Sequence, residues 1–327
     1  MASLHAKSPC CGEKVVRFGN RRRQCAACRK TWRIRKKRRG RKRIRTNPLL
    51  AVRYARRMLP PADARNKDRR QRRLARSGNH LERMLPWPPL PSRRPLIAVA
   101  DAVRIRTEKR ILTLYLMLVR SASASRAWIA EPYVQEGKES WQGWQEAFAI
   151  LPVRTMKGIV ALVSDGHKGL ESVARRHGWL FQRCHFHLIA KLQGRRSRWA
   201  SSRHRLAGEY LYAMVHEILT HPDDATAYRL RDELEEHMTA LGGGQVQRYL
   251  RAFLRETPEY RTYLWYPLLH IPRTSNTAEA LVAIIRRLLS RAHGFRTRAS
   301  IIRWVTALLK TRQTMMCNGS APTELLR

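Results

Sequence analysis

Acidic residues are scarce in this chain of 327 residues. It has 24 Asp and Glu residues against 66 Lys and Arg residues, which gives a formal net charge of +42 at pH 7. A folded protein with this imbalance repels itself unless a polyanion neutralises the charge, so we expect a nucleic acid as its partner. The charge argues against an ordinary near-neutral surface, whereas a ribosomal role or an anionic membrane surface stays open on charge alone.

Long apolar segments and a disulfide pattern are missing as well. The longest apolar run, ILTLYLMLV, is far shorter than the roughly 20 residues that a membrane-spanning helix needs, and the N-terminal MASLHAKSPCCG lacks the apolar part of a signal peptide. Six cysteines are too few for a disulfide scaffold, and four of them lie within residues 10–28. We therefore expect no membrane contact, a reducing compartment, and a metal bound by the clustered cysteines.

Changes in composition divide the chain into five segments. Residues 1–45 hold the clustered cysteines and a basic run, and residues 46–92 are predicted to be a helical, helix-turn-helix-like segment, with the proline-rich PWPPLPSRRP as the boundary to the next segment. Strand patterns dominate residues 93–189, and helical spacing dominates residues 190–265, which we interpret as an all-helical insertion. Residues 266–327 would complete the core with one strongly amphipathic helix.

Strand patterns in the third segment predict the fold class. LIAVADAVRI and RILTLYLMLVR flank RTEK as a hairpin, and RAWIAEPYV is predicted to be a third strand. SWQGWQEAFAILP is expected as a helix, GIVALVSD as a buried strand, GLESVARRHG as a helix and WLFQRCHFHL as another strand. Three consecutive strands followed by alternating helix and strand indicate an α/β fold, with a mixed sheet flanked by helices.

Two aspartates interrupt or end apolar strand patterns. Asp101 lies within LIAVADAVRI, and Asp165 ends GIVALVSD. Burying a lone carboxylate is costly and two neighbouring carboxylates repel each other, so a bound divalent cation would remove both problems. Oxygen ligands with room for water favour Mg²⁺ or Mn²⁺. The competing structural interpretation is that Asp165 only caps the helix that begins near Gly166.

A third acid is less clear from the residues alone. Glu279, in SNTAEA, would stand in the first turn of a helix and could point toward a metal beside the strand ends. With Asn276 it also fits a capping box, in which the glutamate accepts a hydrogen bond from the backbone N–H of the cap residue. Glu256 and Glu259, in ETPEY, are weaker candidates.

The order of these motifs resembles the DDE transposases of bacterial insertion sequences in the Mutator-like group. The similarity covers roughly residues 93–310 through VAD, VSDGHKGL, QRCHFHL and RTSNTAEALVAIIR, and ESWQGWQEAFAIL matches the helix that precedes the second aspartate in that family. The resemblance implies an RNase H-like fold with a helical insertion, for which the 113 residues between Asp165 and Glu279 leave room. It also implies that Asp101, Asp165 and Glu279 form the catalytic triad.

The same resemblance implies the chemistry and the partners. The triad would hold Mg²⁺ or Mn²⁺ for cleavage at transposon ends and strand transfer into target DNA. A homo-oligomer in the bacterial cytoplasm, associated with the nucleoid, would bind this double-stranded DNA. Cys184 and His187 would be the family's C-x-x-H signature. We favour a structural or DNA-positioning role for this pair over zinc binding, because two ligands alone do not make a zinc site.

Two other functions stay open at this point. A non-enzymatic DNA-binding protein, such as a repressor or a decayed transposase, would have no need for two aspartates on strands. An RNase H-like nuclease would cut DNA without joining it. A strand-transfer assay with Mg²⁺ separates these three functions.

The N-terminal SPCCGEKVVRFGNRRRQCAACRKTW resembles the zinc ribbons that begin many such transposases. The matching ligands are Cys11, Cys25 and Cys28. Ser8 stands where the leading cysteine of the first pair is expected, and structural zinc takes four ligands, so Cys10 or His5 would complete the site. The alternative is a degenerate ribbon that binds Zn²⁺ weakly or not at all.

Basic residues crowd the segment around and after the cysteines. From Arg17 to Arg45, sixteen of twenty-nine positions are Lys or Arg, and no acidic residue occurs between Glu13 and Asp63. Such a run binds phosphates without reading much base sequence. The residues predicted to contact DNA are Arg21, Arg22, Arg23, Arg35, Lys36, Lys37, Arg38, Arg39, Arg41, Lys42 and Arg43.

Overall fold

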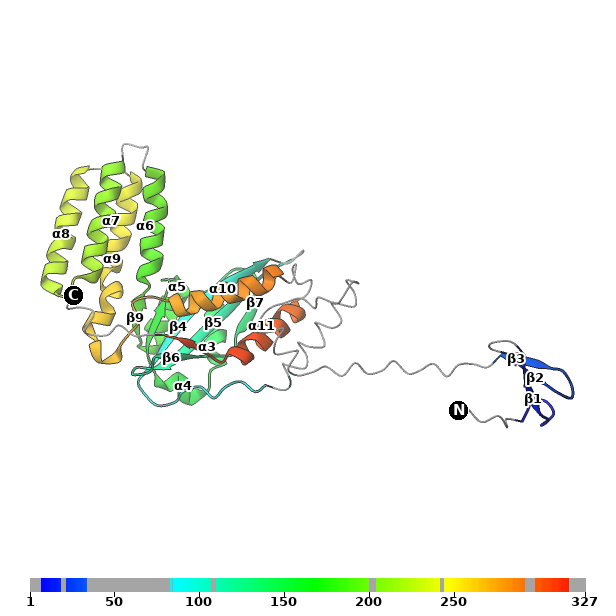
Figure 1. The fold of residues 1–327 in the computed structure, drawn as a ribbon. Helices are drawn as coiled ribbons and strands as arrows, with labels where there is room; N and C mark the ends of the chain where they lie inside the picture. Colours follow the sequence, from blue (N-terminus) through cyan, green and yellow to red (C-terminus); the bar gives the residue numbers. More distant parts are fainter. Residues whose placement is uncertain are drawn as a thin grey trace. The chain divides into compact units, whose positions relative to one another are not determined.

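The chain forms two compact units, residues 1–45 and residues 46–327, and each is described by itself (Figure 1). The computed structural model describes residues 7–18, 22–33, 83, 85–106, 110–199, 204–241, 244–291 and 298–317. Most of the segment predicted to be helix-turn-helix-like, residues 46–92, therefore lies outside the described residues.

The N-terminal unit contains a small antiparallel sheet. Its strands, in spatial order, are β1 (Val15–Arg17), β2 (Arg22–Cys25) and β3 (Thr31–Arg33). Val15 pairs with Cys25, and Arg23 pairs with Trp32. Because β1 begins opposite the end of β2, the turn before β1 lies next to the turn between β2 and β3. Cys10, Cys11 and Cys28 lie in these two turns, and Cys25 is the last residue of β2.

The second unit contains a seven-stranded mixed sheet. The strands are β4 (Leu96–Arg106), β5 (Ile111–Ser121), β6 (Arg126–Ile129), β7 (Tyr133–Glu136), β8 (Ile159–Ser164), β9 (Leu180–Arg183) and β10 (Thr314–Met316). Their order is β10-β6-β5-β4-β8-β9, and β7 also pairs with β5. β4 runs antiparallel to β5 and parallel to β8, which is parallel to β9. The prediction of an α/β fold with a mixed sheet is confirmed.

The long hairpin forms as predicted, but the third strand is divided. Leu96 pairs with Ser121 and Arg106 with Ile111 across β4 and β5. The segment RAWIAEPYV forms two strands, β6 and β7, which pair with successive parts of the same edge of β5. Pro132 lies between them, and a proline has no backbone N–H to donate, so the ladder breaks there.

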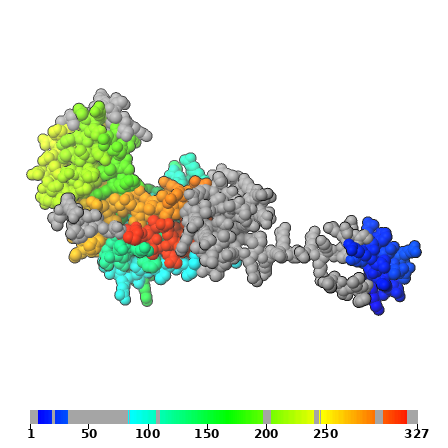
Figure 2. All heavy atoms as spheres, in the orientation of Figure 1, coloured from blue at the N-terminus to red at the C-terminus, as the bar shows by residue number. Residues whose placement is uncertain are grey.

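Helices cover both faces of the sheet. One face packs against α3 (Trp141–Ala149), α4 (Val153–Gly158) and α5 (Lys168–His177). The other face packs against α10 (Asn276–Arg291) and α11 (Arg298–Arg312), which lie side by side in Figure 2. Because side chains alternate between the two faces of a strand, neighbouring residues of β4 belong to different cores. Ala98 and Ala100 face α3, whereas Ile97 and Val99 face α10.

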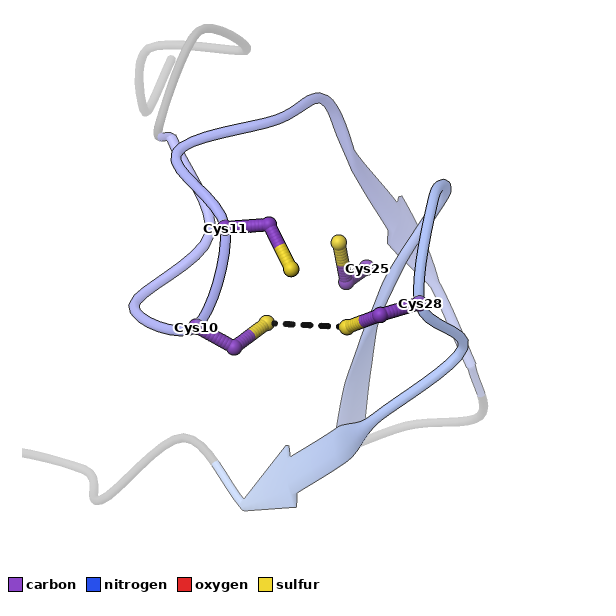
Figure 3. Close-up of side chains that lie close together, drawn as sticks. All are labelled: Cys10, Cys11, Cys25 and Cys28. Atoms are coloured by element: carbon purple, nitrogen blue, oxygen red, sulfur yellow. Dashed lines mark hydrogen bonds between the residues drawn. The ribbon is translucent and has the colours of Figure 1, made fainter.

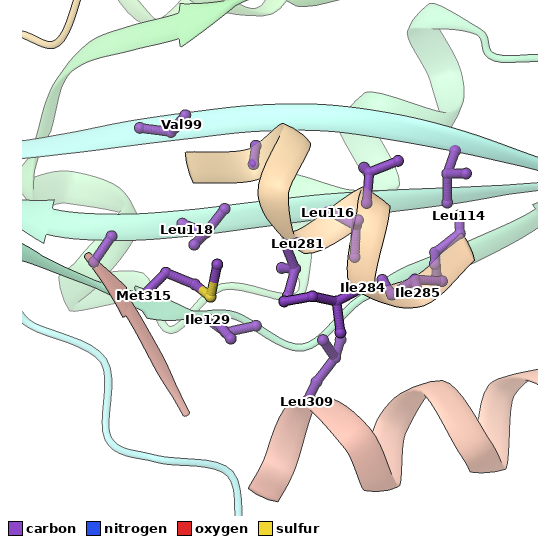
Figure 4. Packing of buried hydrophobic residues seen from close by; sticks show 14 of the residues in the cluster. Val99, Leu114, Leu116, Leu118, Ile129, Leu281, Ile284, Ile285, Leu309 and Met315 are labelled. Atoms are coloured by element: carbon purple, nitrogen blue, oxygen red, sulfur yellow. The ribbon is translucent and has the colours of Figure 1, made fainter. Parts of the chain in front are cut away.

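Apolar residues of α10 anchor it to the sheet (Figure 4). The buried residues of this contact are Leu281, Ile284 and Ile285 of α10, Leu309 of α11, and Val99, Leu114, Leu116 and Leu118 of the sheet. A fully buried side chain of this size contributes roughly 1.5–3 kcal/mol. The predicted amphipathic helix is thus confirmed, and its first turn is held at a fixed place over β4.

Four helices between β9 and α10 pack around a core of their own. They are α6 (His185–Trp199), α7 (Arg205–Thr220), α8 (Asp224–Leu241) and α9 (Gly244–Trp265), followed by the short 3₁₀ helix η1 (Pro267–Leu269). Figure 1 shows α6 to α9 side by side. Leu211, Val215 and Ile218 of α7 share their core with Leu250 and Phe253 of α9. Among the helices that the structure describes, none is both long and apolar enough to cross a bilayer.

Only the first half of WLFQRCHFHL is a strand. β9 ends at Arg183, and α6 begins at His185. His185, Leu188 and Leu192 are buried at intervals of three and four residues, which is the helical period rather than the alternation of a strand. The C-x-x-H signature therefore lies at the junction between a strand and a helix.

Candidate functional site

Strand register brings Asp101 and Asp165 to matching positions on neighbouring strands. Val99 of β4 pairs with Val163 of β8, and each aspartate comes two residues after its valine. Both valines pack on the face that α10 covers. Since a step of two residues along a strand returns to the same face, both aspartates are directed toward the α10 side of the sheet.

Asp101 carries a strongly perturbed carboxylate. Burial raises the pKa of Asp101 to about 7, and the negative charges of Asp165 and, less strongly, Glu279 add to this shift. The backbone N–H of Ala102 donates to Asp101 Oδ1 over 2.7 Å, which favours the charged form. Asp101 therefore lies within electrostatic reach of the other two acids predicted from the sequence, in a place that disfavours its own charge.

Asp165 follows β8 directly and does not cap the next helix. Its Oδ1 accepts a hydrogen bond from the backbone N–H of His167 over 3.0 Å. The cap of α5 is His167 itself, whose Nδ1 accepts from the backbone N–H of Gly169 over 3.1 Å. The interpretation of Asp165 as the helix cap is thus wrong, and its carboxylate is left beside Asp101.

Glu279 lies in the first turn of α10, where its Oε1 meets three polar groups. The Ser275 hydroxyl donates to it over 3.1 Å, and the Cys184 thiol donates over 3.8 Å. His187 Nδ1 lies 3.3 Å from the same oxygen. One carboxylate oxygen of Glu279 is therefore held in a defined position by groups from α6 and from the residue that precedes α10.

The cap of α10 differs from the predicted capping box. The carbonyl of Ser275 accepts from the backbone N–H groups of Ala278 and Glu279, so Ser275 and not Asn276 is the cap residue. The backbone N–H of Ser275 donates to Cys184 Sγ over 3.2 Å and not to the glutamate. Glu279 is consequently free of the capping role that competed with a metal-binding role.

Cys184 and His187 connect the end of β8 with the start of α10. Cys184 is buried, and its backbone N–H donates to the carbonyl of Ser164, the residue before Asp165, over 2.7 Å. Contact with the Cys184 sulfur raises the pKa of His187 to about 9, and the charge of Glu279 adds to it. The signature pair thus contacts both the strand that carries Asp165 and the carboxylate of Glu279.

A fourth acidic residue, Glu139, lies near Asp165 and was not recognised in the sequence. Glu139 accepts a hydrogen bond from Trp144 Nε1 over 2.8 Å and lies 3.4 Å from His167 Nδ1. Burial raises the pKa of Glu139, and the charge of Asp165 contributes to the shift. No strand pattern surrounds Glu139, so only its proximity to SWQGWQEAF could have drawn attention to it.

The weaker third-acid candidates, Glu256 and Glu259, have a different partner. Both belong to α9 and form ion pairs with Arg183, whose side chain is only 9% exposed. Arg183 also pairs with Glu171 of α5 over 3.2 Å and donates to the carbonyl of Gly166 over 3.2 Å. These glutamates bind an arginine that supports the loop after Asp165.

The four predicted cysteines converge in the N-terminal unit (Figure 3). The Sγ atoms of Cys10, Cys11, Cys25 and Cys28 all lie within 4.8 Å of one another. Ser8 is buried, and its hydrogen bond lowers the pKa of Cys25 to about 6, whereas a hydrogen bond with Cys28 raises the pKa of Cys11 to about 12. Four sulfurs at this spacing suit one tetrahedral ion. His5, the other candidate ligand, lies outside the described residues.

Few of the residues predicted to bind DNA can be located. Arg22 and Arg23 lie on β2, next to the cysteine cluster. Arg21 and the basic run at residues 35–43 lie outside the described residues.

Comparison with known proteins bears on the second unit. No curated protein matches the chain. The family model "Transposase, Mutator family" matches residues 97–317, a span that begins in β4, includes all three predicted acids and ends just after β10. This match covers more than half of the sequence and agrees with the order of motifs along the chain. The protein belongs to the Mutator family of transposases.

Proposed function

We propose that the protein cleaves DNA at transposon ends and joins these ends to target DNA, with Asp101, Asp165 and Glu279 as the catalytic acids. The observation that carries the proposal is that the three acids, far apart in sequence, interact electrostatically across one small region between β4, β8 and α10. Membership of the transposase family supports a role in DNA transposition. The burial of Asp101 beside two like charges supports a catalytic rather than a structural role.

The donor set fits a magnesium-type ion. Three carboxylates offer hard oxygen ligands, and the raised pKa of Asp101 reflects burial and repulsion that a divalent cation would relieve. When bound, such ions would activate the attacking oxygen as a nucleophile and stabilise the charge on the leaving oxygen in an in-line displacement at phosphorus. The protein's own part is to hold the carboxylates at fixed positions on strands and on the first turn of a helix.

Cys184, His187 and Ser275 have a positioning role in this proposal. Their contacts converge on Oε1 of Glu279, which leaves the other carboxylate oxygen to face a cation. Since α10 is anchored on the sheet by its apolar face, these contacts fix the orientation of the carboxylate rather than the position of the helix. This accounts for the C-x-x-H signature without assigning it a step in the reaction.

Each segment of the sequence has its own role in the proposed function. Residues 93–189 and 266–327 would form an RNase H-like catalytic core, which the mixed sheet with helices on both faces supports. Residues 190–265 would be the helical insertion of that core. Residues 1–45 would form a zinc ribbon with a basic run, and residues 46–92 a helical DNA-binding segment. The four converging sulfurs support zinc.

The proposed partner is double-stranded DNA, at both the transposon ends and the target. The net charge of +42 supports this partner. Because two transposon ends must be brought together, we expect a homo-oligomer on DNA. Light scattering of the complex with transposon-end DNA tests this expectation. One protein chain bound to a pair of transposon ends would contradict a homo-oligomer.

A strand-transfer assay on the full chain tests the proposed function. Wild type should cleave and join end DNA with Mg²⁺ or Mn²⁺ and not with Ca²⁺. Asp101→Asn, Asp165→Asn and Glu279→Gln should each lower the rate by about 10²-fold or more, since each removes a charge that holds the cations. Glu233→Gln, an exposed glutamate of α8, is the matched control and should leave the rate unchanged.

Three outcomes separate this function from its alternatives. Cleavage without joining would indicate a nuclease. DNA binding with neither activity would indicate a non-enzymatic DNA-binding protein. Full joining by Glu279→Gln would show that the third acid is assigned wrongly.

A further inference from the structure

Three side chains of different chemical types meet at the start of α10. The Cys184 sulfur, one imidazole nitrogen of His187 and one carboxylate oxygen of Glu279 all lie within 4.8 Å of one another. Cys184 is buried, and the other two residues are half-buried. Mg²⁺ prefers oxygen ligands, whereas a sulfur, an imidazole nitrogen and a carboxylate oxygen are the ligands that Zn²⁺ takes in proteins.

We propose that Cys184, His187 and Glu279 form a second zinc site, separate from the cysteine cluster, which weakens the binding of the catalytic cation by Glu279 when it is filled. Zinc binding itself follows from the three side chains alone. The inhibitory consequence rests on the proposed function, in which Glu279 is the third catalytic acid.

The distances between the ligand atoms fit a tetrahedral ion. Zinc lies about 2.0–2.1 Å from nitrogen and oxygen ligands and about 2.3 Å from sulfur, which places the ligand atoms of a tetrahedron roughly 3.3–3.7 Å apart. Glu279 Oε1 lies 3.3 Å from His187 Nδ1 and 3.8 Å from Cys184 Sγ. Both distances from Glu279 Oε1 therefore lie within a few tenths of an ångström of the values for one tetrahedral ion.

The ligand atoms are also in suitable hydrogen-bonding states. His187 Nδ1 is buried and, among the residues that the structure describes, has no hydrogen-bond partner, so no hydrogen bond has to be broken there when a zinc ion takes the place of the imidazolium proton. Cys184 Sγ accepts the backbone N–H of Ser275, an outer contact that stabilises a thiolate ligand. Ser275 also donates to Glu279 Oε1 and fixes the third ligand. A fourth position stays open for water, as in many three-ligand zinc sites.

Zinc and magnesium would share the carboxylate of Glu279 but use different oxygens. Zinc would bind Oε1, on which the contacts of Cys184 and His187 converge, and the catalytic cation would face the other oxygen. Two divalent cations on one carboxylate repel each other, so bound zinc would weaken cation binding at the catalytic centre. Excess Mg²⁺ should displace zinc poorly, because only zinc gains from the sulfur and nitrogen ligands. We expect Zn²⁺ to inhibit strand transfer at concentrations far below those at which Mg²⁺ supports it.

Zinc content of the full chain tests the site without any measurement of activity. The double variant Cys25→Ser, Cys28→Ser removes two ligands of the cysteine cluster, so that zinc retained by this protein reports the second site. After dialysis against Zn²⁺ with excess Mg²⁺, we expect about one zinc ion per chain. Adding Cys184→Ala or His187→Gln should lower the affinity for the retained zinc ion by about tenfold or more. Cys317→Ser replaces another buried cysteine and is the matched control that should retain zinc.

The proposal is overturned if the double variant holds no zinc, or if both Cys184→Ala and His187→Gln retain it. Thermal unfolding checks that each variant is folded, and the half-buried His187 provides a second test if the buried Cys184 does not tolerate substitution. Strand transfer is measured in parallel on the same proteins. Zinc binding without any strand transfer would contradict the proposed function but support the second zinc site. Strand transfer without retained zinc would contradict the site alone.

Discussion

Asp101 lies where an ionised carboxylate is unfavourable as long as no cation is bound. Its pKa in the folded protein, about 7, is above the ordinary aspartate value of 3.8, because burial and the charge of Asp165 disfavour ionisation. The folded protein therefore holds this proton more tightly than the unfolded chain does. Above pH 7 the ionised carboxylate destabilises the fold, and the penalty decreases as the pH falls from 7 toward 3.8.

Asp101→Asn should therefore stabilise the metal-free protein at alkaline pH. At pH 8 without divalent ions, we expect its melting temperature to exceed that of wild type by about 3 °C or more. The difference should shrink as the pH is lowered to 5, and added Mg²⁺ should stabilise wild type but not the variant. Asp232→Asn is the control, since the Asp232 side chain is 70% exposed. An unchanged melting temperature at pH 8 would mean that Asp101 is not strained by its surroundings.

At the scale of elements, Arg183 joins β9 to two helices and to the loop after Asp165. It forms ion pairs with Glu171 of α5 and with Glu256 and Glu259 of α9. Gly166 has a φ of +89°, and a Cβ at this position would collide with the Arg183 guanidinium. The close approach of the arginine thus requires glycine directly after Asp165.

Replacing Arg183 should cost far more stability than replacing a surface arginine with a shared partner. Arg183→Met removes the nearly buried cation that three glutamates share, and breaking such a buried pair costs about 3–5 kcal/mol. Arg175 also pairs with Glu171 but is 77% exposed, so Arg175→Met should cost about 1 kcal/mol or less. Urea unfolding of both variants measures the difference. Equal losses for the two variants would contradict a buried network.

Most helices and strands could be predicted because their apolar periodicity was strong. β4, β5 and β8 are apolar runs with strand propensity, and α10 shows apolar residues at intervals of three and four. The exceptions are local. Pro132 divides one predicted strand, and a strand-like composition concealed the start of α6 at His185. Both features depend on backbone hydrogen bonding, which a hydrophobic pattern does not encode.

Sequence patterns indicated the three acids but not the groups around them. Asp101 and Asp165 could be found because they interrupt apolar strands. Ser275 and Glu139 could not be found in this way, since each is recognised only by a side-chain hydrogen bond that forms on folding and that no apolar pattern marks. For the same reason, the partners of Glu256 and Glu259 became apparent only from the packing of α9 against β9.

At the scale of the whole molecule, positive charge is the dominant property. The net charge of +42 is spread over a chain whose basic run at residues 35–43 carries no acidic residue. Such a run is expected to neutralise phosphates and release counterions whatever the base sequence. It would add affinity for DNA without adding specificity.

Neutralising the basic run should change the salt dependence of DNA binding more than its specificity. With the eight Lys and Arg residues of positions 35–43 replaced by Gln, the slope of log affinity against log salt should become shallower by up to about 0.9 per lost phosphate contact. A variant with the same residues in shuffled order should keep the wild-type slope. An unchanged slope in the Gln variant would place the phosphate contacts elsewhere, and titrations at several salt concentrations measure it.

The most direct measurement of the central claim is anomalous diffraction from crystals of the full chain grown with Mn²⁺. Coordination of a cation by three converging acids predicts an anomalous peak within bonding distance of Asp101, Asp165 and Glu279, and its loss in Asp165→Asn crystals. Density at the cysteine cluster alone, with no peak between β4, β8 and α10 in the wild type, would contradict the account.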